Sequence, residues 1–293
     1  MHPTLAALLS GHVVLTDGAW GTQLQARGLA VGDFPDAWNL THPDAVREVA
    51  EAYIAAGSQI ILTNTFGANR LRLADNGLAD QTALINRRGV ELSRQAAGNQ
   101  AKVFASIGPT GKLLMSGEVT EDDLRTAFNE QAQALAEAGA DAIVIETMAD
   151  LTEATLAVQA AKATGLPVVA CMVFDSGKNK DRTLMGVTPE QAATALGEAG
   201  ADVVGANCGQ GIAGFIPICR RMRTATERPL WMKPNAGLPE LEGGRTVYRT
   251  KPEEFATHAQ DLIQAGASFI GGCCGTSPAF IQALRQALAS SPA

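Results

Sequence analysis

The sequence predicts a (β/α)₈ barrel, and three observations lead to this fold class. Eight short apolar runs alternate with eight amphipathic stretches over 293 residues, which is the pattern of a closed parallel barrel. The phrase Ala-Gly followed by Ala or Ser recurs between an amphipathic stretch and the next apolar run. Long polar loops follow several of the apolar runs, as they do on the catalytic face of such barrels.

The predicted strands are short runs rich in Val, Ile, Leu and Ala, as expected for strands that are covered on both faces. They are 13–16, 59–63, 103–107, 142–146, 168–174, 203–206, 230–233 and 268–271. Because their connections are long enough to contain a helix, we expect neighbouring strands to be parallel.

An amphipathic stretch follows each predicted strand. The predicted helices are 44–56, 81–97, 121–138, 150–164, 188–198, 212–225, 252–265 and 277–288. Thr120 and Ser277 stand where N-caps are expected. The recurring phrase places a glycine just after four of these helices, where a left-handed residue commonly ends a helix. The repetition favours a βα repeat.

The alternative to a barrel is a doubly wound open sheet. No Gly-x-Gly-x-x-Gly turn follows the first strand, which weighs against the dinucleotide-binding version of that fold. No linker-like stretch divides the chain, so we expect one domain over 1–293.

Composition narrows the class of protein. The net charge of −7 and the isoelectric point near 5.2 argue against nucleic acid as a standing partner. There is no apolar run long enough for a membrane span and no basic, then apolar, N-terminal leader, so we expect a cytoplasmic protein without a membrane partner. The 5 cysteines do not form a disulfide framework in a chain of this length and are better explained as metal ligands or buried thiols.

Polar residues stand where the predicted strands end. In a parallel barrel these ends meet at one mouth, where active sites lie. The residues are Asp17, Asn64, Ser106, Glu146, Asn207, Cys208, Lys233, Asn235, Cys273 and Cys274.

Three of the cysteines form the strongest candidate site. Cys208, Cys273 and Cys274 follow strands that lie two apart in the barrel, and each is next to a glycine or one residue from it. Three thiolates with an open fourth position are typical of a catalytic zinc site, and soft sulfur ligands favour zinc over magnesium or calcium. The alternative, small buried core residues, is our expectation for Cys171 and Cys219.

The charge of such a site indicates its chemistry. A fourth sulfur bound beside three thiolates is deprotonated by the metal, so the expected reaction is attack by a substrate thiol on an electrophilic carbon. Asp17 and Glu146 could bind a substrate ammonium, although an N-cap and a salt bridge across the barrel are their alternatives. Trp20, Phe34 and Trp38 could line the pocket or pack beneath the first long loop.

The chain resembles the homocysteine S-methyltransferase family. The matching segments run in order through almost the whole chain and are Asp17-Gly18-Ala19-Trp20-Gly21-Thr22, Thr63-Asn64-Thr65-Phe66, Ser106-Ile107-Gly108-Pro109-Thr110-Gly111, Glu146-Thr147, Gly205-Ala206-Asn207-Cys208 and Gly271-Gly272-Cys273-Cys274-Gly275-Thr276. The resemblance implies a zinc-bearing (β/α)₈ barrel that methylates homocysteine to methionine. It also implies that Cys208, Cys273 and Cys274 are the zinc ligands.

The resemblance extends to substrate contacts. It implies that Asp17 and Glu146 hold the amino group of homocysteine and that backbone amides near Gly18 and Ala19 hold its carboxylate. The segment Lys233-Pro234-Asn235-Ala236-Gly237-Leu238-Pro239 is most similar to the homocysteine module of cobalamin-dependent methionine synthase. By that similarity, Asn235 would take zinc's fourth position before homocysteine arrives.

The methyl donor stays open at this point. Similarity to the homocysteine module alone implies a separate methyl-corrinoid protein or a small donor. Betaine-dependent relatives carry Tyr where this chain has Gly67 and Thr147, so their cation cage is absent in that form. Some bacterial betaine-dependent enzymes nevertheless resemble this sequence. Two further alternatives are a barrel that binds homocysteine as a carrier or sensor, and a methyltransferase that acts on another thiol.

Overall fold

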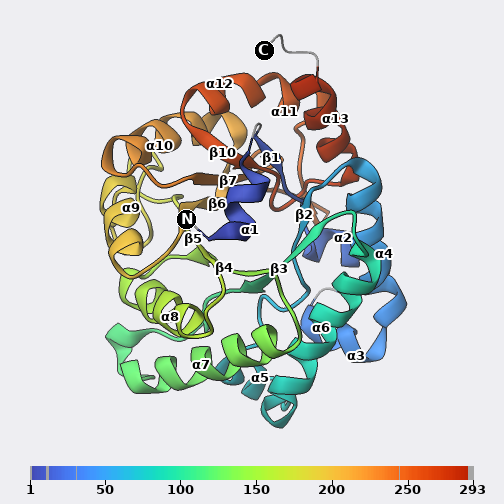
Figure 1. Ribbon diagram of the computed structural model, residues 1–293, viewed down its shortest axis with the longest axis vertical. Coiled ribbons are helices and arrows are strands. Elements are labelled where there is room, and N and C mark those ends of the chain that lie inside the picture. The colour runs from blue at the N-terminus through green and yellow to red at the C-terminus, as the bar shows by residue number, and fades with distance from the viewer. Residues whose placement is uncertain (1, 11–12, 31, 244, 290–293) are drawn as a thin grey trace.

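Eight parallel strands form a nearly closed barrel in the computed structural model, which describes residues 2–10, 13–30, 32–243 and 245–289 (Figure 1). The strands are β1 Val14–Leu15, β2 Ile60–Ile61, β3 Lys102–Ile107, β4 Ala142–Met148, β5 Val168–Met172, β6 Val203–Gly211, β7 Leu230–Asn235 and β10 Ala267–Ile270. Their order is β1-β10-β7-β6-β5-β4-β3-β2. The predicted (β/α)₈ barrel is therefore confirmed, while both ends of the predicted 1–293 domain lie outside the described residues.

The barrel closes between β1 and β2 through one residue. The backbone N–H of Gln59 donates to the carbonyl oxygen of Leu15 at 2.8 Å, and the N–H of Leu15 donates to Gln59 Oε1 at 3.0 Å. Because this amide side chain completes the hydrogen bonding of the two shortest strands, the eight strand ends form a single ring.

Helices surround the strands, except for α1, which lies across one end of the barrel (Figure 1). They are α1 Pro3–Leu8, α2 Gly21–Gln25, α3 Trp38–Thr41, α4 Pro43–Ala56, α5 Arg70–Ala74, α6 Thr82–Ala97, α7 Glu121–Glu137, α8 Leu151–Ala163, α9 Pro189–Glu198, α10 Ile212–Ala225, α11 Pro252–Thr257, α12 Ala259–Gln264 and α13 Pro278–Ala289. All eight predicted helices are present, with one correction. The predicted helix 252–265 is two helices, because the N–H of His258 donates to the carbonyl of Phe255, a tighter i−3 bond that interrupts the α-helical turn.

The predicted cap at Thr120 and the predicted helix-ending glycines are confirmed, while the cap at Ser277 stays a prediction. Thr120 forms a capping box with Asp123 at the start of α7. The four glycines of the recurring phrase have left-handed backbones, with φ of 108° at Gly57, 89° at Gly139, 112° at Gly200 and 111° at Gly266. Each therefore turns the chain from a helix toward the next strand without the steric cost that a side chain would bring.

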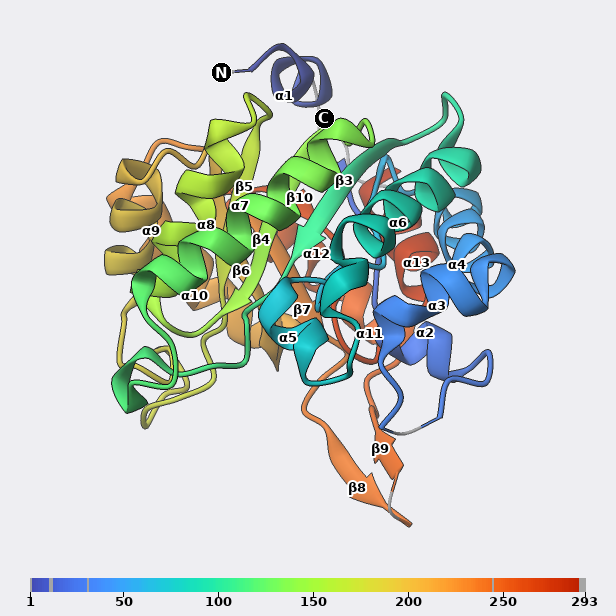
Figure 2. The same cartoon turned by 90° about the horizontal axis from the view of Figure 1, so that it is seen from below.

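Two features beyond the repeat lie at opposite ends of the barrel (Figure 2). Helix α1 covers the N-terminal end of the strands. The antiparallel hairpin of β8 Glu240–Glu242 and β9 Arg245–Val247 stands out from the other end. The strand repeat does not predict either one, because both belong to connecting segments.

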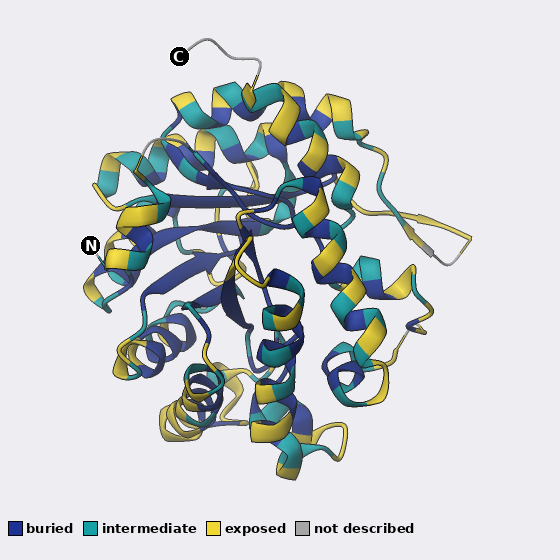
Figure 3. Cartoon of the chain, turned by 45° about the vertical axis from the view of Figure 1, so that its right-hand side comes forward, coloured by how far each residue is buried: buried dark blue, intermediate teal, exposed yellow. Residues whose placement is uncertain are grey.

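The N-terminal half of the barrel interior is filled with apolar side chains. Trp231 packs between Phe104 and Phe269, with ring centroids 6.1 and 5.2 Å from its own. Leu5 of α1 covers this cluster at the N-terminal end of the barrel, which we call the lower end. A second apolar layer lies between the strands and the inner faces of the helices, whose outer faces are exposed (Figure 3). The packed lower half supports the strand ends at which the polar residues lie.

Among the described residues, no helix has the length and apolar character needed to span a membrane.

Candidate active site

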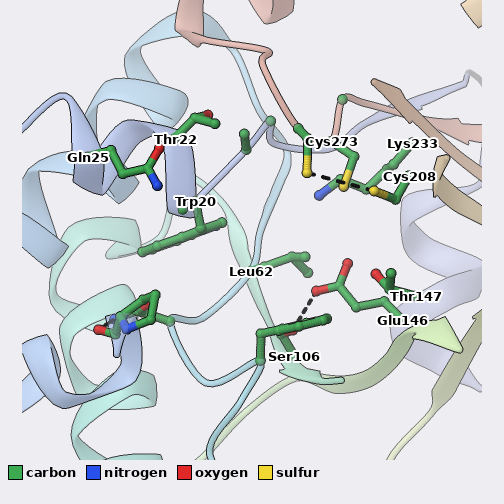
Figure 4. Close-up of a pocket in the computed structure, with 18 of the residues that line it drawn as sticks. Trp20, Thr22, Gln25, Leu62, Ser106, Glu146, Thr147, Cys208, Lys233 and Cys273 are labelled. Carbon is green, nitrogen blue, oxygen red and sulfur yellow. Dashed lines mark hydrogen bonds between the residues drawn. The ribbon is translucent and has the colours of Figure 1, made fainter. Parts of the chain in front are cut away.

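The C-terminal ends of the strands surround a cavity of about 420 Å³ (Figure 4). Its wall includes the three predicted zinc cysteines together with Gly18, Ala19 and Glu146. This volume lies within the usual range for small-molecule sites. The topology thus brings most of the predicted site residues to one cavity.

The sulfur cluster consists of Cys208 in β6 and of Cys273 and Cys274 just after β10. The three sulfurs lie within 4.8 Å of one another, and Sγ of Cys208 is 3.7 Å from Sγ of Cys274. Cys208 has a φ of 63°, which is costly for a residue with a side chain. A strained backbone that is maintained at such a cluster is typical of a functional site.

The electrostatics of the cluster favour a cation. Hydrogen bonds from Cys273 and then Cys274 lower the pKa of Cys208 to about 3. The same interaction raises the pKa of Cys273 well above its usual value and that of Cys274 to about 12. One thiolate forms easily and the next two do not, because their negative charges would repel. A bound metal cation removes that repulsion.

Asn235 provides a direct test of whether the cluster fits a metal. Its side chain is only 3% exposed, yet Oδ1 has no hydrogen-bond partner among the described residues. The side chain contacts Cys208, whose pKa it helps to lower. A buried oxygen without a donor is costly unless a ligand satisfies it. Three sulfurs and one such oxygen match the donor set of zinc, so these residues fit that ion.

Backbone hydrogen bonds fix Cys273 and Cys274 to the strand that carries Asn235. The N–H of Cys273 donates to the carbonyl of Pro234 at 2.7 Å, and the N–H of Ala236 donates to that of Cys274 at 3.0 Å. The loop after β10 is therefore fixed to the end of β7, next to Asn235.

Asn207, fully buried in β6, links the cluster to Glu146. Its Oδ1 accepts a hydrogen bond from the N–H of Thr147 at 2.7 Å, and its Nδ2 donates to Thr147 Oγ1 at 2.7 Å. The same Nδ2 lies 3.4 Å from a Glu146 oxygen and 3.7 Å from Sγ of Cys273. The amide also holds Thr147 in a left-handed conformation with φ of 62°.

Glu146 faces the cavity from the end of β4. Ser106 Oγ donates to its Oε1 at 2.5 Å. Burial raises the pKa of this carboxyl, although the Lys233 ammonium and the Ser106 hydrogen bond act in the opposite direction. The carboxylate is therefore a strong candidate for pairing with a cation in the cavity, because a positive charge would relieve the cost of its burial.

Asp17 does not line the cavity and is fully buried beneath it. Lys233 forms an ion pair with Oδ1, while Oδ2 accepts hydrogen bonds of 2.7 Å from Trp20 Nε1 and from the N–H of Leu62. Burial disfavours the charged form of Lys233, but Asp17 and Glu146 outweigh it, so the pKa of this lysine is raised. Lys233 and Trp20 reach the cavity wall, whereas the carboxylate that holds them does not.

Gly18 and Ala19 form the wall beside the sulfur cluster. A Cβ at Gly18 would lie 2.7 Å from both Thr276 Oγ1 and the Tyr53 hydroxyl oxygen, so only glycine fits. The N–H of Ala19 already donates to Thr276 Oγ1 at 3.1 Å. Of the three aromatic residues of the first long loop, Trp20 lines the cavity, while Trp38 stacks on His42 with centroids 4.2 Å apart and Phe34 packs against Gly67.

Some residues of the cavity wall were not predicted to be functional. They are Phe66, Arg72, Asp36 and, from the segment after the hairpin, Tyr248. Burial and then the Cys274 thiol raise the pKa of Tyr248, so its hydroxyl stays protonated beside the sulfurs. Lys233 was among the polar residues at strand ends, although no role was predicted for it. Arg72 and Tyr248 lie in connections between strands, where no sequence pattern marks a functional residue.

Comparison with known proteins gives a consistent result. The family model described as homocysteine S-methyltransferase matches residues 14–288. The methionine synthase of Mycobacterium tuberculosis is 33% identical over 98% of this chain, and that of Mycobacterium leprae is 31% identical over 97%. Each alignment covers 25% of the relative, so the chain spans about a quarter of the length of these proteins.

Solved structures agree with the sequence relatives. The metallated form of the homocysteine methyltransferase MmuM from Escherichia coli superposes with a TM-score of 0.81 at 25% identity, covering 96% of this chain and 99% of that one. Its oxidized form gives a TM-score of 0.80 at the same identity, covering 97% and 99%.

Proposed function

Because the chain belongs to the homocysteine S-methyltransferase family, we propose that it is a zinc-dependent enzyme that transfers a methyl group to homocysteine and forms methionine. One observation carries the proposal: the sulfur cluster, which the unpartnered side chain of Asn235 contacts at Cys208, lines the same cavity as the buried acid Glu146. A thiol amino acid needs both, a site for its sulfur and a partner for its ammonium.

Cys208, Cys273 and Cys274 would hold the zinc, with Asn235 as a fourth ligand that substrate can displace. When bound, the ion would supply thiol activation, because it lowers the pKa of a coordinated thiol so that the sulfur is a thiolate at neutral pH.

Glu146 receives the homocysteine ammonium. The hydroxyl of Ser106 and the amide of Asn207 fix this carboxylate toward the cavity. The carboxylate end of the amino acid lies along the wall formed by Gly18 and Ala19, where the Ala19 N–H is already bonded to Thr276 Oγ1. Asp17 acts indirectly, because it holds Lys233 and Trp20, both of which line the cavity. We therefore assign it a positioning role and no direct contact with the ammonium.

The transfer is a single displacement. The homocysteine sulfur attacks the donor's methyl carbon, the S–C bond forms as the bond from that carbon to the donor breaks, and the donor leaves with the bonding electron pair. The protein contributes the alignment of the two molecules and the exclusion of water from the thiolate. The donor is a methyl-corrinoid, on a separate protein, or a betaine-like small molecule.

The experiment combines zinc analysis with a donor screen. The wild-type protein should bind about one zinc per chain and convert homocysteine to methionine with one of betaine, dimethylsulfoniopropionate, S-methylmethionine or methylcobalamin. Cys208→Ala should lose both properties. Cys219→Ala is the matched control, because Cys219 is buried in α10 against the carbonyls of Leu262 and Ala265, outside the cavity wall.

A zinc-free protein with full activity would contradict the proposal. Zinc-dependent binding of homocysteine without methionine from any donor would favour a carrier or sensor.

A further inference from the structure

Arg72 is a cation of the cavity wall that the proposed reaction does not yet use. It lies on α5, two residues after Arg70, and the two arginines differ sharply. Arg70 forms a two-pronged ion pair with Glu130, at 2.7 and 2.6 Å. Arg72 lines the cavity, and within the described residues no carboxylate oxygen lies within ion-pair distance of its guanidinium. Among the described residues, this arginine of the cavity therefore has no ion-pair partner at close range.

An aromatic ring holds this arginine in place. The guanidinium carbon of Arg72 lies 5.6 Å from the centroid of the Phe66 ring. Phe66 in turn packs directly on Gly108, where a side chain would collide with the ring. A cation–π contact takes up none of the N–H groups, so the guanidinium of Arg72 can still donate a pair of hydrogen bonds to an anion.

Asp36 interacts electrostatically with Arg72 and offsets its positive charge only in part. It is 3% exposed and accepts a hydrogen bond from the N–H of Gly67 at 2.9 Å. Burial raises its pKa to about 7, even though the Gly67 hydrogen bond and Arg72 lower it. At neutral pH a substantial fraction of Asp36 is therefore uncharged, and Arg72 keeps a net positive field in the cavity.

The charges of the cavity wall are thus of two kinds. Glu146 and the sulfur cluster make one part negative, since Lys233 is already paired with Asp17. Arg72 makes another part positive. Trp20, Thr22 and Gln25 lie across the pocket from Cys208 and Cys273 (Figure 4), and the Thr22 hydroxyl oxygen is buried with no partner among the described residues. A second polar ligand would satisfy this group and Arg72.

We propose that Arg72, held against Phe66, binds the carboxylate of a small zwitterionic methyl donor whose methylated onium centre points toward the sulfur cluster. This inference rests on the proposed function. An onium centre matches the negative part of the cavity and its aromatic residues Trp20 and Tyr248. Its transfer step balances: the homocysteine thiolate takes the methyl carbon, the C–N or C–S bond of the onium breaks, and a neutral amine or sulfide leaves with the electron pair.

Two ligands that cannot react test the two charged ends of the donor separately. Choline carries the trimethylammonium group without a carboxylate, and 3,3-dimethylbutyrate carries the carboxylate beside an uncharged group of the same shape. Calorimetry should detect 3,3-dimethylbutyrate binding to the wild-type zinc protein. Arg72→Met should weaken that binding about tenfold or more, since a charge-assisted bidentate contact is lost. Choline should bind wild-type protein and variant alike.

Kinetics with betaine should agree with the binding data. Arg72→Met should raise KM for betaine about tenfold with a much smaller change in kcat, Arg72→Lys should restore part of the loss, and Arg88→Met should match the wild type. Arg88 is the matched control, because it pairs with Glu91 on α6 and does not line the cavity.

Three results would overturn the inference. They are unchanged 3,3-dimethylbutyrate binding in Arg72→Met, no binding of this ligand to the wild type, and methionine formed from methylcobalamin but from neither betaine nor dimethylsulfoniopropionate. Zinc-dependent binding of homocysteine is measured separately. If it persists while the inference about Arg72 fails, the proposed function is not contradicted; if it is absent too, both fail.

Discussion

The same strands form both halves of the barrel interior, but the lower half is apolar and packed, whereas the upper half is polar and lines the cavity. Residues that alternate along β7 point into the barrel, namely Trp231, Lys233 and Asn235. The first packs in the apolar lower cluster, the second pairs with a buried acid, and the third has an unsatisfied oxygen. Within three inward positions the strand passes from a packed interior to a site that needs a ligand.

The other strands repeat this change. Phe104 is followed by Ser106 on β3, Val144 by Glu146 on β4, and Val203 by Asn207 two inward positions later on β6. The apolar lower half stabilises the barrel, and that stability allows the upper half to retain buried charges and strained residues that are unfavourable on their own. Variants at the two levels should therefore behave differently.

The largest effect is expected for Lys233→Met. It leaves the Asp17 carboxylate buried without its cation, and breaking a buried pair in this way costs about 3–5 kcal/mol. Urea unfolding measures the loss. The double variant Asp17→Asn, Lys233→Met should recover part of it, because neither charge remains. A stability equal to that of the wild type in the single variant would contradict the ion pair.

The next largest effect is expected at Asp36 and concerns how the free energy of unfolding depends on pH. Its folded pKa of about 7 lies above the ordinary 3.8, so the folded state binds the proton more tightly. Stability from this group is full below about pH 4 and falls as the pH rises to 7, by at most about 4 kcal/mol. In Asp36→Asn this decline should vanish, while the amide oxygen can still accept the Gly67 hydrogen bond. Unfolding curves between pH 4 and 7 that are parallel for the two proteins would refute this.

A smaller effect is expected for Asn207→Ala. The amide orients Glu146, Thr147 and Cys273 together. Loss of such a supporting contact typically weakens metal affinity about 10–100-fold. Competition with a zinc chelator measures this loss. An unchanged zinc affinity would show that the sulfur cluster is positioned without Asn207.

The smallest effect is expected at the opposite end, for Trp231→Phe. The change removes apolar area from the lower cluster but also removes an indole N–H that has no partner among the described residues. The two terms oppose each other, so stability should change by no more than about 1 kcal/mol. Zinc content and the KM for homocysteine should not change. A loss of zinc would show that the two levels are coupled.

The sequence by itself determined the barrel and the position of the sulfur cluster. Both follow from local and topological rules: apolar runs alternate with amphipathic stretches, and the ends of parallel strands converge at one mouth. For that reason Cys208 could be expected beside Cys273 and Cys274, although Cys208 stands 65 positions before Cys273 in the chain.

The tertiary structure alone decided which polar groups remain available for a ligand. Asp17, Glu146 and Lys233 all stand at strand ends, but only contacts across the barrel pair Asp17 with Lys233 and leave Glu146 facing the cavity. Arg72 and Tyr248 come from connections whose paths no periodicity specifies. Strand ends converge because of backbone geometry, whereas the pairing of charges depends on distances between segments far apart in the sequence, which only the folded chain sets.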